Sequence, residues 1–547
     1  MSLRRLRIRH FRGVARLDID LDPLTVAIGE NACGKSSLLD AVAIVLGAHG
    51  HTGACRLRAA DVEHDAGSPV MLAADLALPL DAVDAVLGFR PDADAQGRAL
   101  LRLVVVGARR GGGGLRRRWR VEATVQGRRA RRELQADELA ALQAQVPVLL
   151  IRHGRPVAGS VASLGRLPAG RRVHALLDAG FDSLGRQGAG PGCGVTEGAR
   201  SARRLAAGLP AQPDALPSLH DLVVAVSSAL GTRSPANLDG GVPLSGQGSA
   251  ALAIASLHLC AALLWAREAC APDAPQPLVM VESPESGLHP LLLASAWRVL
   301  EGLVAQRLVA TESGAVIANV PLPALRRITG DNGRRRVHRM EPDAFHTDEL
   351  RKLGYHVRAR RGDALFARCW LLVEGESEFW YLPGFAGLLG LDLAAEGVAC
   401  IEFAQCGVRP LIQLADALGI GWHVVCDGDS AGATYARVAA ECLQGRPRRR
   451  HISRLGAPDI EHLLWDAGYR QAIMALLAGG EGAVAADAPE RLIQTLGQRV
   501  SKPALAMAVL DAARATDGPG VPPALAGAIE ACVAQARGQG DAGAATA

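Results

Sequence analysis

The chain has 547 residues, more than one ordinary hydrophobic core accommodates, so two or three domains are expected. Hydrophobic residues make up 49% of it, which excludes a largely disordered protein and leaves only residues 536–547 as a predicted disordered tail. The 60 basic and 55 acidic residues give a formal net charge of +5, which over this length does not by itself indicate a polyanionic partner.

The cysteines and the apolar segments of the chain indicate its cellular compartment. Eleven cysteines are scattered singly, without a C-x-x-C pair or a histidine spacing typical of zinc, which favours reduced thiols over a disulfide framework. The basic N-terminus has no apolar signal segment. The longest apolar stretch, 250–266, is interrupted by polar residues and falls short of a membrane span. We therefore expect a cytoplasmic protein without membrane contact.

The first motif in the chain is a phosphate-binding loop. Residues 29–36, GENACGKS, fit G-x-x-x-x-G-K-[ST] between an apolar strand over 24–28 and a helix-like segment, which is the context that this motif requires. Backbone N–H groups would surround the phosphates of ATP, Lys35 would reach the β- and γ-phosphates, and Ser36 would hold Mg²⁺. The predicted ATP-binding residues of this segment are Gly29, Glu30, Asn31, Ala32, Cys33, Gly34, Lys35, Ser36 and Ser37.

Arginine replaces lysine almost everywhere in this chain. Of the 60 basic residues only Lys35, Lys352 and Lys502 are lysines. A compact ammonium has chemistry that a planar guanidinium does not imitate, so lysines inside motifs are candidate functional residues. Lys35 and Lys502 lie in motifs, whereas Lys352 lies on a polar stretch without one. Arginines also crowd residues 102–132, two β-like segments around a glycine turn, which form either a solvated face or a ribbon that contacts phosphates.

Three features follow in the middle of the chain. Residues 155–240 are rich in Gly, Pro, Ala and Arg and are predicted to form a helical insertion. Residues 244–248, LSGQG, then open a long apolar helix, and the buried-strand pattern of 278–281 ends in Glu282. An acid at the end of such a strand, beside a P-loop, is where a second Mg²⁺ contact belongs.

In this order the P-loop, LSGQG and the strand acid resemble the signature of ABC-type ATPases. The opening segment resembles the SMC, RecF and Rad50 branch, whose members act on DNA. The resemblance implies a head-to-head homodimer in which Ser245 and Gly246 of one subunit cover the ATP of the other, and insertions such as 155–240 commonly serve dimerisation in this class.

Two positions depart from the family pattern. Ser283 stands where a catalytic glutamate usually follows the strand acid, with Glu285 two residues on. Glu312 stands where a switch histidine usually follows the next strand. We therefore expect ATP binding with weak or slow hydrolysis.

Carboxylates follow two buried strands in the last third of the chain. One apolar strand leads into EGESE, which contains Glu374 and Glu378, and a second leads into DGDSAG, which contains Asp427 and Asp429. The carboxyl ends of neighbouring parallel strands meet at one edge of a sheet. Such an oxygen-rich cluster suits Mg²⁺ or Mn²⁺, and two ions can stabilise the attacking and leaving oxygens of a phosphodiester.

These two motifs resemble a Toprim domain, a Rossmann-like fold shared by topoisomerases, some primases and a group of nucleases. A topoisomerase needs a tyrosine nucleophile, normally outside the Toprim fold, whereas all four tyrosines (355, 381, 435 and 469) lie in or beside this region. A primase of this type usually has a zinc module, which the cysteines do not support. Hydrolytic cleavage of DNA remains.

Together with the ATPase half, the C-terminal motifs resemble the OLD (overcoming lysogenization defect) family of ATP-dependent nucleases. The resemblance spans nearly the whole chain and is weakest over 155–240. It implies that Lys502, in the segment VSKPALA, lies beside the scissile phosphate and is catalytic together with Asp427 and Asp429. The metal ligands that it implies are Glu374, Glu378, Asp427, Asp429 and Glu461.

The sequence therefore predicts an α/β protein with an ABC-type P-loop ATPase domain over 1–365 and a Toprim nuclease domain over 366–535. Its predicted function is a metal-dependent DNA endonuclease that a dimeric ATPase regulates. With 3% aromatic residues, contacts to the DNA backbone with weak sequence preference are expected. The alternative is a DNA-binding ATP switch or clamp without nuclease activity. The motifs do not distinguish DNA repair from phage defence or identify a partner such as a helicase.

Overall fold

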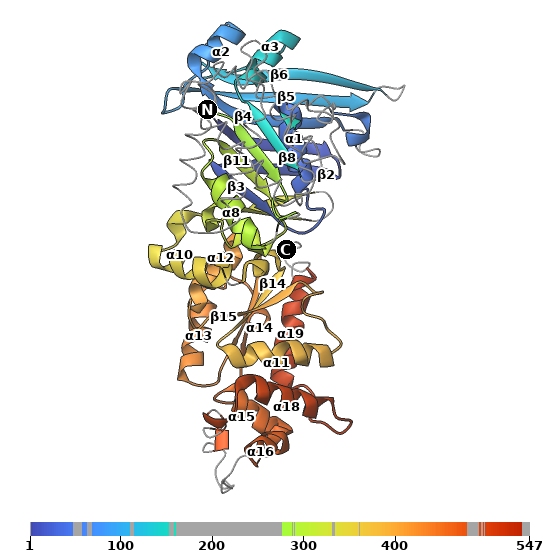
Figure 1. The fold of residues 1–547 in the computed structure, drawn as a ribbon, viewed down its shortest axis with the longest axis vertical. Coiled ribbons are helices and arrows are strands. Elements are labelled where there is room, and N and C mark those ends of the chain that lie inside the picture. The colour runs from blue at the N-terminus through green and yellow to red at the C-terminus, as the bar shows by residue number, and fades with distance from the viewer. Residues whose placement is uncertain are drawn as a thin grey trace, which may run out of the picture. The chain divides into compact units, whose positions relative to one another are not determined.

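The protein is described by a computed structural model, in which the chain divides into two compact units, Met1–His338 and Arg339–Ala547 (Figure 1). No helix among the described residues is long and apolar enough to cross a bilayer. The described residues are 2–47, 57–62, 68–109, 114–152, 158–159, 276–330 without 287 and 289, 334–359, 361–478, 492, 493, 496 and 498–538.

The amino-terminal unit contains two sheets. One is antiparallel, in the order β2-β1-β4-β5-β6-β7, and the other has the order β13-β12-β3-β11-β10-β8-β9, parallel from β12 to β8. The strands are β1 Ser2–Phe11, β2 Val14–Asp20, β3 Leu24–Ile28, β4 Val70–Pro79, β5 Arg98–Arg109, β6 Leu115–Val125, β7 Arg128–Glu133, β8 Val148–Arg152, β9 Ala158–Gly159, β10 Leu278–Glu282, β11 Gln306–Ala310, β12 Leu325–Thr329 and β13 Arg336–His338. The helices are α1 Lys35–Val45, α2 Leu80–Leu87, α3 Ala136–Ala144, α8 Pro290–Glu301 and α9 Gly314–Ile317.

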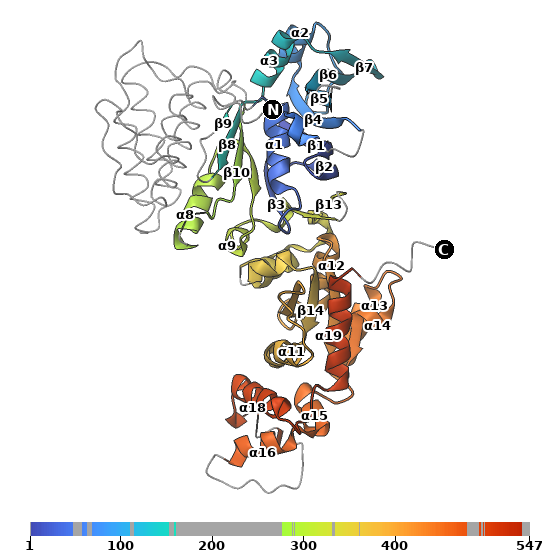
Figure 2. The same ribbon diagram turned by 90° about the vertical axis from the view of Figure 1, so that its right-hand side faces the viewer.

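Helix α1 lies between the two sheets of this unit, with β8 and β10 on one side and β1 and β2 on the other (Figure 2). Most of its side chains, including Leu38, Leu39 and Val42, are fully buried. A helix that is apolar on nearly every side is stable only when protein covers every side. One aliphatic core therefore joins the two sheets and fixes the start of α1, which follows the P-loop.

The carboxyl-terminal unit is built on four parallel strands in the order β15-β14-β16-β17. The two central strands, CWLLV in β14 and GWHVVC in β16, are almost completely buried, because helices cover the sheet, and α19 packs along all four strands. The strands are β14 Cys369–Val373, β15 Val398–Glu402, β16 Gly421–Cys426 and β17 Ile452–Arg454. The helices are α10 Thr347–Leu353, α11 Glu376–Leu388, α12 Val408–Ala417, α13 Ser430–Glu441, α14 Arg448–His451, α15 Ile460–Leu464, α16 Arg470–Ala478, α18 Lys502–Arg514 and α19 Pro523–Ala536.

The compact units and the predicted domains are divided at different residues. The units divide after His338, and α10, which precedes residue 365, packs on α12 of the carboxyl-terminal unit, while the domain boundary near 365 stays a prediction. Helix α19 continues to Ala536, the first residue of the expected tail. Most of the insertion 155–240 and the LSGQG loop with Ser245 and Gly246 lie outside the described residues.

Candidate functional sites

The loop after β3 has the backbone of a phosphate-binding loop. Gly29 has a φ of +150°, and a Cβ atom there would lie 2.4 Å from the carbonyl oxygen of Ile328. Gly34, with a φ of +102°, ends the loop at the start of α1. Only glycine accommodates the close approach at position 29. The loop therefore leads directly into a helix N-terminus, where free N–H groups and the helix dipole favour an anion.

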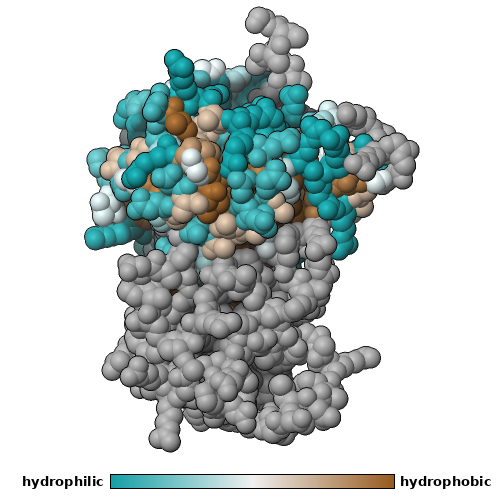
Figure 3. Space-filling model, turned by 90° about the horizontal axis from the view of Figure 1, so that it is seen from above, coloured by the Kyte–Doolittle hydropathy of each residue, from teal (hydrophilic) through white to brown (hydrophobic). Residues whose placement is uncertain are grey.

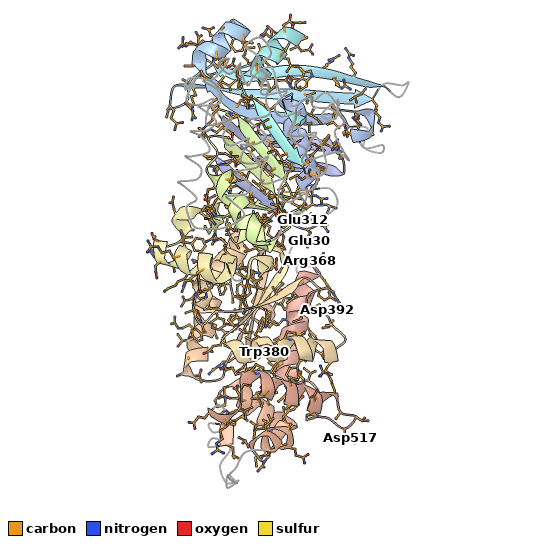
Figure 4. All side chains as sticks on the ribbon, viewed as in Figure 1. Glu30, Glu312, Arg368, Trp380, Asp392 and Asp517 are labelled. Atoms are coloured by element: carbon orange, nitrogen blue, oxygen red, sulfur yellow. The ribbon has the colours of Figure 1, made fainter. Side chains whose placement is uncertain are left out.

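Lys35 is buried inside this loop. Its side chain is 7% exposed and forms an ion pair with Glu312, with 3.0 Å between Nζ and Oε1. Nζ also donates to the carbonyl oxygens of Gly29 at 2.7 Å and Glu30 at 2.9 Å. Lys35 therefore contacts both Glu30 and Glu312, which are labelled in Figure 4. The structure therefore places Lys35 where the motif predicted it, with a carboxylate beside its ammonium group.

Glu312 makes two further contacts that link the loop to neighbouring strands. Asn31, with its amide nitrogen turned toward Glu312, donates to Oε1 at 2.8 Å and to Oε2 at 2.6 Å. The backbone N–H of Glu312 donates to Glu285 Oε1 at 3.2 Å, and Thr311 Oγ1 donates to Glu285 Oε2 at 2.9 Å. The P-loop is thus connected to the segments that follow β10 and β11. The sequence identified position 312 as unusual but gave no sign of these contacts.

Glu282, at the end of β10, is ion-paired with Arg152 at the end of the adjacent strand β8. Arg152 also pairs with Asp40 of α1 at 2.6 Å. Burial acts to lower the pKa of Arg152, but Asp40 and Glu282 outweigh it and raise that pKa. Ser283 has a φ of +49°. Sequence reasoning missed Arg152 and Asp40, because no local pattern connects residues so distant along the chain.

Glu374 and Asp427 lie at the ends of adjacent parallel strands in the carboxyl-terminal unit, as predicted. Glu374 follows β14, and Asp427 follows β16, the parallel neighbour of β14. Oε2 of Glu374 and Oδ1 of Asp427 are buried and have no hydrogen-bond partner among the described residues. A buried carboxylate oxygen is costly unless a hydrogen bond or a cation satisfies it.

The carboxylates of this site raise one another's pKa values. Burial, followed by the charges of Glu378 and Glu374, raises the pKa of Asp427 to about 8. Burial also raises the pKa of Glu378, with contributions from Glu461 and Glu374. Burial and the charge of Asp429 raise the pKa of Glu374. Carboxylates that disfavour one another's ionisation are suited to a bound cation, which removes the repulsion.

Two carboxylates near this cluster also cap helices. Asp429 is the N-cap of α13 and accepts from the N–H of Gly432 at 2.7 Å. Asp459 is the N-cap of α15 and accepts from the N–H of His462 at 2.8 Å. The charge of Asp459 contributes to the raised pKa of Asp427. Sequence reasoning did not assign Asp459 to the site, although an aspartate directly before a helix was a usable signal.

Glu461 joins the cluster through the first turn of α11. Ser377 Oγ donates to Glu461 Oε1 at 3.0 Å, and Ser377 and Glu378 are both buried. Tyr381, one turn further on, is 1% exposed, and burial together with Glu461 and Glu378 raises its pKa. A tyrosine nucleophile needs access to its substrate and a hydroxyl that ionises readily. Tyr381 has neither property, so it does not fit the role of a topoisomerase nucleophile.

The structure does not bring Lys502 into contact with the carboxylates. Lys502 begins α18, its side chain is exposed, and Ser501 caps the helix by accepting from the N–H of Ala504 at 3.4 Å. Within the described ranges, no group of three His, Cys, Asp or Glu side chains is arranged to hold a metal ion. The predicted ligands are therefore close enough to interact electrostatically, but they do not form a ready ligand set, and the role of Lys502 stays a prediction.

Arginines line one face of β6 and β7, which we call the arginine face. Alternate residues of a strand share a face, and Val121 and Ala123 of β6 point into the core. The strand register places the even-numbered residues of β6 opposite the odd-numbered residues of β7 on the other face, where Glu122 and Glu133 offset part of the charge. The arginines of this face are Arg116, Arg118, Arg120, Arg129 and Arg131.

Two protein-family models match the chain. Residues 365–429 match the model described as "Overcoming lysogenization defect protein-like, TOPRIM domain". Residues 1–65 and 244–364 match a model described as "Protein of unknown function (DUF2813)". The second match begins in the amino-terminal unit, includes the P-loop and Glu282, and ends where the Toprim match begins.

The chain is also similar to individual proteins. It is 39% identical over 196 residues to the uncharacterized protein YbjD of Escherichia coli (strain K12), and the match covers 36% of this chain and 36% of YbjD. The C-terminal region of the Burkholderia pseudomallei OLD protein is 20% identical, with 30% of this chain and 96% of that chain covered and a TM-score of 0.26. The SMC head domain from Thermotoga maritima is 15% identical, with 62% and 100% covered and a TM-score of 0.30.

The structure joins an amino-terminal α/β unit that contains a P-loop to a carboxyl-terminal unit with a parallel sheet, whose residues 365–429 match a Toprim domain. The match of residues 365–429 confirms the resemblance that the sequence predicted. Residues 365–429 are thus similar to the Toprim domain of OLD-like proteins, and residues 1–65 and 244–364 are similar to a family of unknown function.

Proposed function

We propose that this protein is a metal-dependent DNA endonuclease controlled by ATP binding or slow hydrolysis in a dimeric ATPase head. The observation that supports it best is the pair of buried carboxylate oxygens of Glu374 and Asp427, which lack hydrogen-bond partners at the ends of adjacent strands. A divalent cation would satisfy both oxygens and relieve the repulsion that raises the pKa of Asp427 to about 8.

The carboxylates of the Toprim unit would hold Mg²⁺ or Mn²⁺, which supplies charge that stabilises the attacking and leaving oxygens of the phosphodiester. Asp429 would be kept in place by its hydrogen bond to the start of α13. Lys502, exposed at the start of α18, would approach a phosphate of bound DNA and stabilise developing negative charge. The proposed ligands are Glu374, Glu378, Asp427, Asp429 and Glu461.

The ATPase head would bind ATP through residues 29–37, with Ser36 and Glu282 toward Mg²⁺. Because Ser283 carries no carboxylate and Glu312 no imidazole, we expect slow turnover, with nucleotide acting mainly as a regulator. Ser245 and Gly246 of a second copy would cover this ATP in a homodimer.

The sugar–phosphate backbone of DNA would contact the arginine face. Along one face of a strand, side chains recur about every 6.8 Å, so β6 presents guanidinium groups in a row. Seen from the end of the unit that carries α2, α3 and β6, the described surface is mostly hydrophilic with a narrow apolar band (Figure 3). The guanidinium groups of the arginine face suit phosphate contacts that are sensitive to salt and indifferent to sequence.

Cleavage of supercoiled plasmid tests the proposed activity. We expect the full-length protein to nick or linearise plasmid with Mg²⁺ or Mn²⁺, and Asp427→Asn to abolish cutting while Lys352→Ala, a surface lysine paired with Asp348, cuts normally. Intact plasmid under every metal and nucleotide condition, or equal cutting by Asp427→Asn, would show that the proposed hydrolysis is wrong.

A DNA-binding ATP switch without nuclease activity is the second candidate. It is favoured by the absence, within the described ranges, of three side chains already arranged around a cation site. ATP-dependent DNA binding without cleavage, together with metal affinity unchanged in Asp427→Asn, would support this candidate over the first.

A further inference from the structure

We propose that the Glu312 carboxylate is an internal competitor for the phosphate-binding groups of the P-loop, so that ATP binds by displacing it. The inference rests on the proposed ATP binding and identifies the residue that sets the nucleotide affinity of this head. It concerns a position where a carboxylate stands in place of the imidazole that the resembling ATPases carry.

The groups that Glu312 holds are those that a phosphate would need. The Lys35 ammonium lies 3.0 Å from Oε1, and the Asn31 amide, turned toward Glu312, lies 2.8 Å from Oε1 and 2.6 Å from Oε2. Lys35 is the P-loop lysine and Asn31 is a loop residue between the two glycines of the motif. The carboxylate and a phosphate are both anions and accept from the same donors, so they exclude one another from this position.

Two features of the fold hold Glu312 at this position, namely the pairing of β11 with β3 and the hydrogen bonds to Glu285. Strand β11, which Glu312 follows by two residues, pairs in parallel with β3, so both strands end at the P-loop edge of the sheet. Glu285 holds the segment by accepting from the backbone N–H of Glu312 at 3.2 Å and from Thr311 Oγ1 at 2.9 Å. The backbone of Glu312 is therefore anchored independently of its side chain.

The two members of the ion pair differ in their freedom to move. The Lys35 side chain is 7% exposed, and its Nζ is also bonded to two loop carbonyl oxygens, whereas the Glu312 side chain is 50% exposed. Displacement therefore moves the Glu312 carboxylate into solvent and leaves Lys35 in the loop. A carboxylate is well hydrated in water, so this movement is reversible and allows nucleotide concentration to determine which anion occupies the site.

Competition of this kind lowers the apparent affinity for ATP. A ligand that binds only the open arrangement has its dissociation constant raised by the inverse of the open fraction, so a site closed nine-tenths of the time loses about tenfold in affinity. Glutamine at position 312 keeps the size of the side chain but removes the charge that Lys35 attracts. Removing the competitor is therefore expected to tighten ATP binding, whereas removing an ordinary surface ion pair leaves it unchanged.

Calorimetric titration of the full-length protein with MgATP tests the inference. We expect Glu312→Gln and Glu312→Ala each to lower the Kd for ATP by about tenfold. Glu301→Gln is the matched control, because Glu301 ends α8 before β11 begins, away from the P-loop edge of the sheet, and it should leave the Kd unchanged. Thermal unfolding of each variant confirms that it is folded.

The outcomes separate this inference from the proposed function. A Kd for Glu312→Gln and Glu312→Ala within twofold of the unsubstituted protein, or weaker, would overturn the competition. If the unsubstituted protein and every variant fail to bind ATP, the proposed nucleotide control is wrong together with the inference built on it. Tight binding by the unsubstituted protein that Lys35→Ala abolishes, combined with the tenfold gain in the Glu312 variants, supports both.

Discussion

Glu374 and Asp427 end adjacent parallel strands, and each holds one buried carboxylate oxygen without a hydrogen bond among the described residues. Both groups have raised pKa values because of burial and neighbouring negative charge. Burial and neighbouring charge therefore disfavour the ionised carboxylate relative to the protonated form at both positions. A metal ion needs both groups ionised, so metal binding and proton release are coupled at this site.

The first prediction concerns the pH dependence of metal binding. The pKa of Asp427 is about 8 before metal binds, so at pH 7 this group is largely protonated and the cation must displace its proton. The apparent affinity for Mn²⁺ should rise by up to about tenfold per pH unit between pH 6 and 8, and then level off. Calorimetry in two buffers of different ionisation enthalpy measures the released proton. An affinity that does not change across this range would contradict the prediction, and Asp427→Asn should bind weakly at every pH.

The local parts of both sites were predictable from sequence, because each depends on an apolar strand that runs directly into a motif. The P-loop after β3 and the carboxylates after β14 and β16 are of this kind. Contacts between distant segments were not predictable. The ion pairs of Lys35 with Glu312 and of Arg152 with Glu282 depend on which strands lie side by side. No local sequence pattern predicts the strand order β3-β11-β10-β8.

The second prediction concerns the buried His423 of β16. His423 is 0% exposed, with Nδ1 2.8 Å from the carbonyl oxygen of Arg450 and Nε2 2.9 Å from Ser453 Oγ. Burial lowers its pKa to about 4, so the folded state binds this proton less readily than the unfolded chain. Its contribution to stability is present above pH 6.5 and is lost as the pH falls toward 4, with a cost of up to about 3 kcal/mol.

Chemical unfolding of the full-length protein at pH 7.5 and pH 4.5 measures this loss. His423→Gln keeps a donor and an acceptor but does not titrate, so its stability should change less between the two pH values. Equal pH sensitivity of the two proteins would show that His423 is not responsible.

The third prediction compares two glycines of the carboxyl-terminal unit. A Cβ atom at Gly432 would lie 2.1 Å from the carbonyl oxygen of Asp427, so Gly432→Ala should displace the metal-site loop and destabilise the protein by about 1–3 kcal/mol. Gly387 lies in α11 with nothing within 4 Å of a Cβ atom, so Gly387→Ala should stabilise by up to about 1 kcal/mol. Thermal unfolding and Mn²⁺ titration check both variants. Normal metal affinity in Gly432→Ala would mean that the loop tolerates this displacement.

The last prediction tests whether the arginine face binds DNA or is only solvated. Arg116 and Arg118 lie on the same face of β6, and replacing both with alanine removes two positive charges. If both contact phosphates, DNA affinity falls and the slope of log K against log salt concentration becomes shallower by about 1.8. The matched control replaces Arg409 and Arg437, which both pair with Glu441, and removes the same charge from the carboxyl-terminal unit. If only the net charge of the protein mattered, both double variants would show the same change in DNA affinity and in salt slope. A shallower slope in the β6 variant alone identifies direct phosphate contacts, because only the loss of contacts reduces the number of counterions that binding releases.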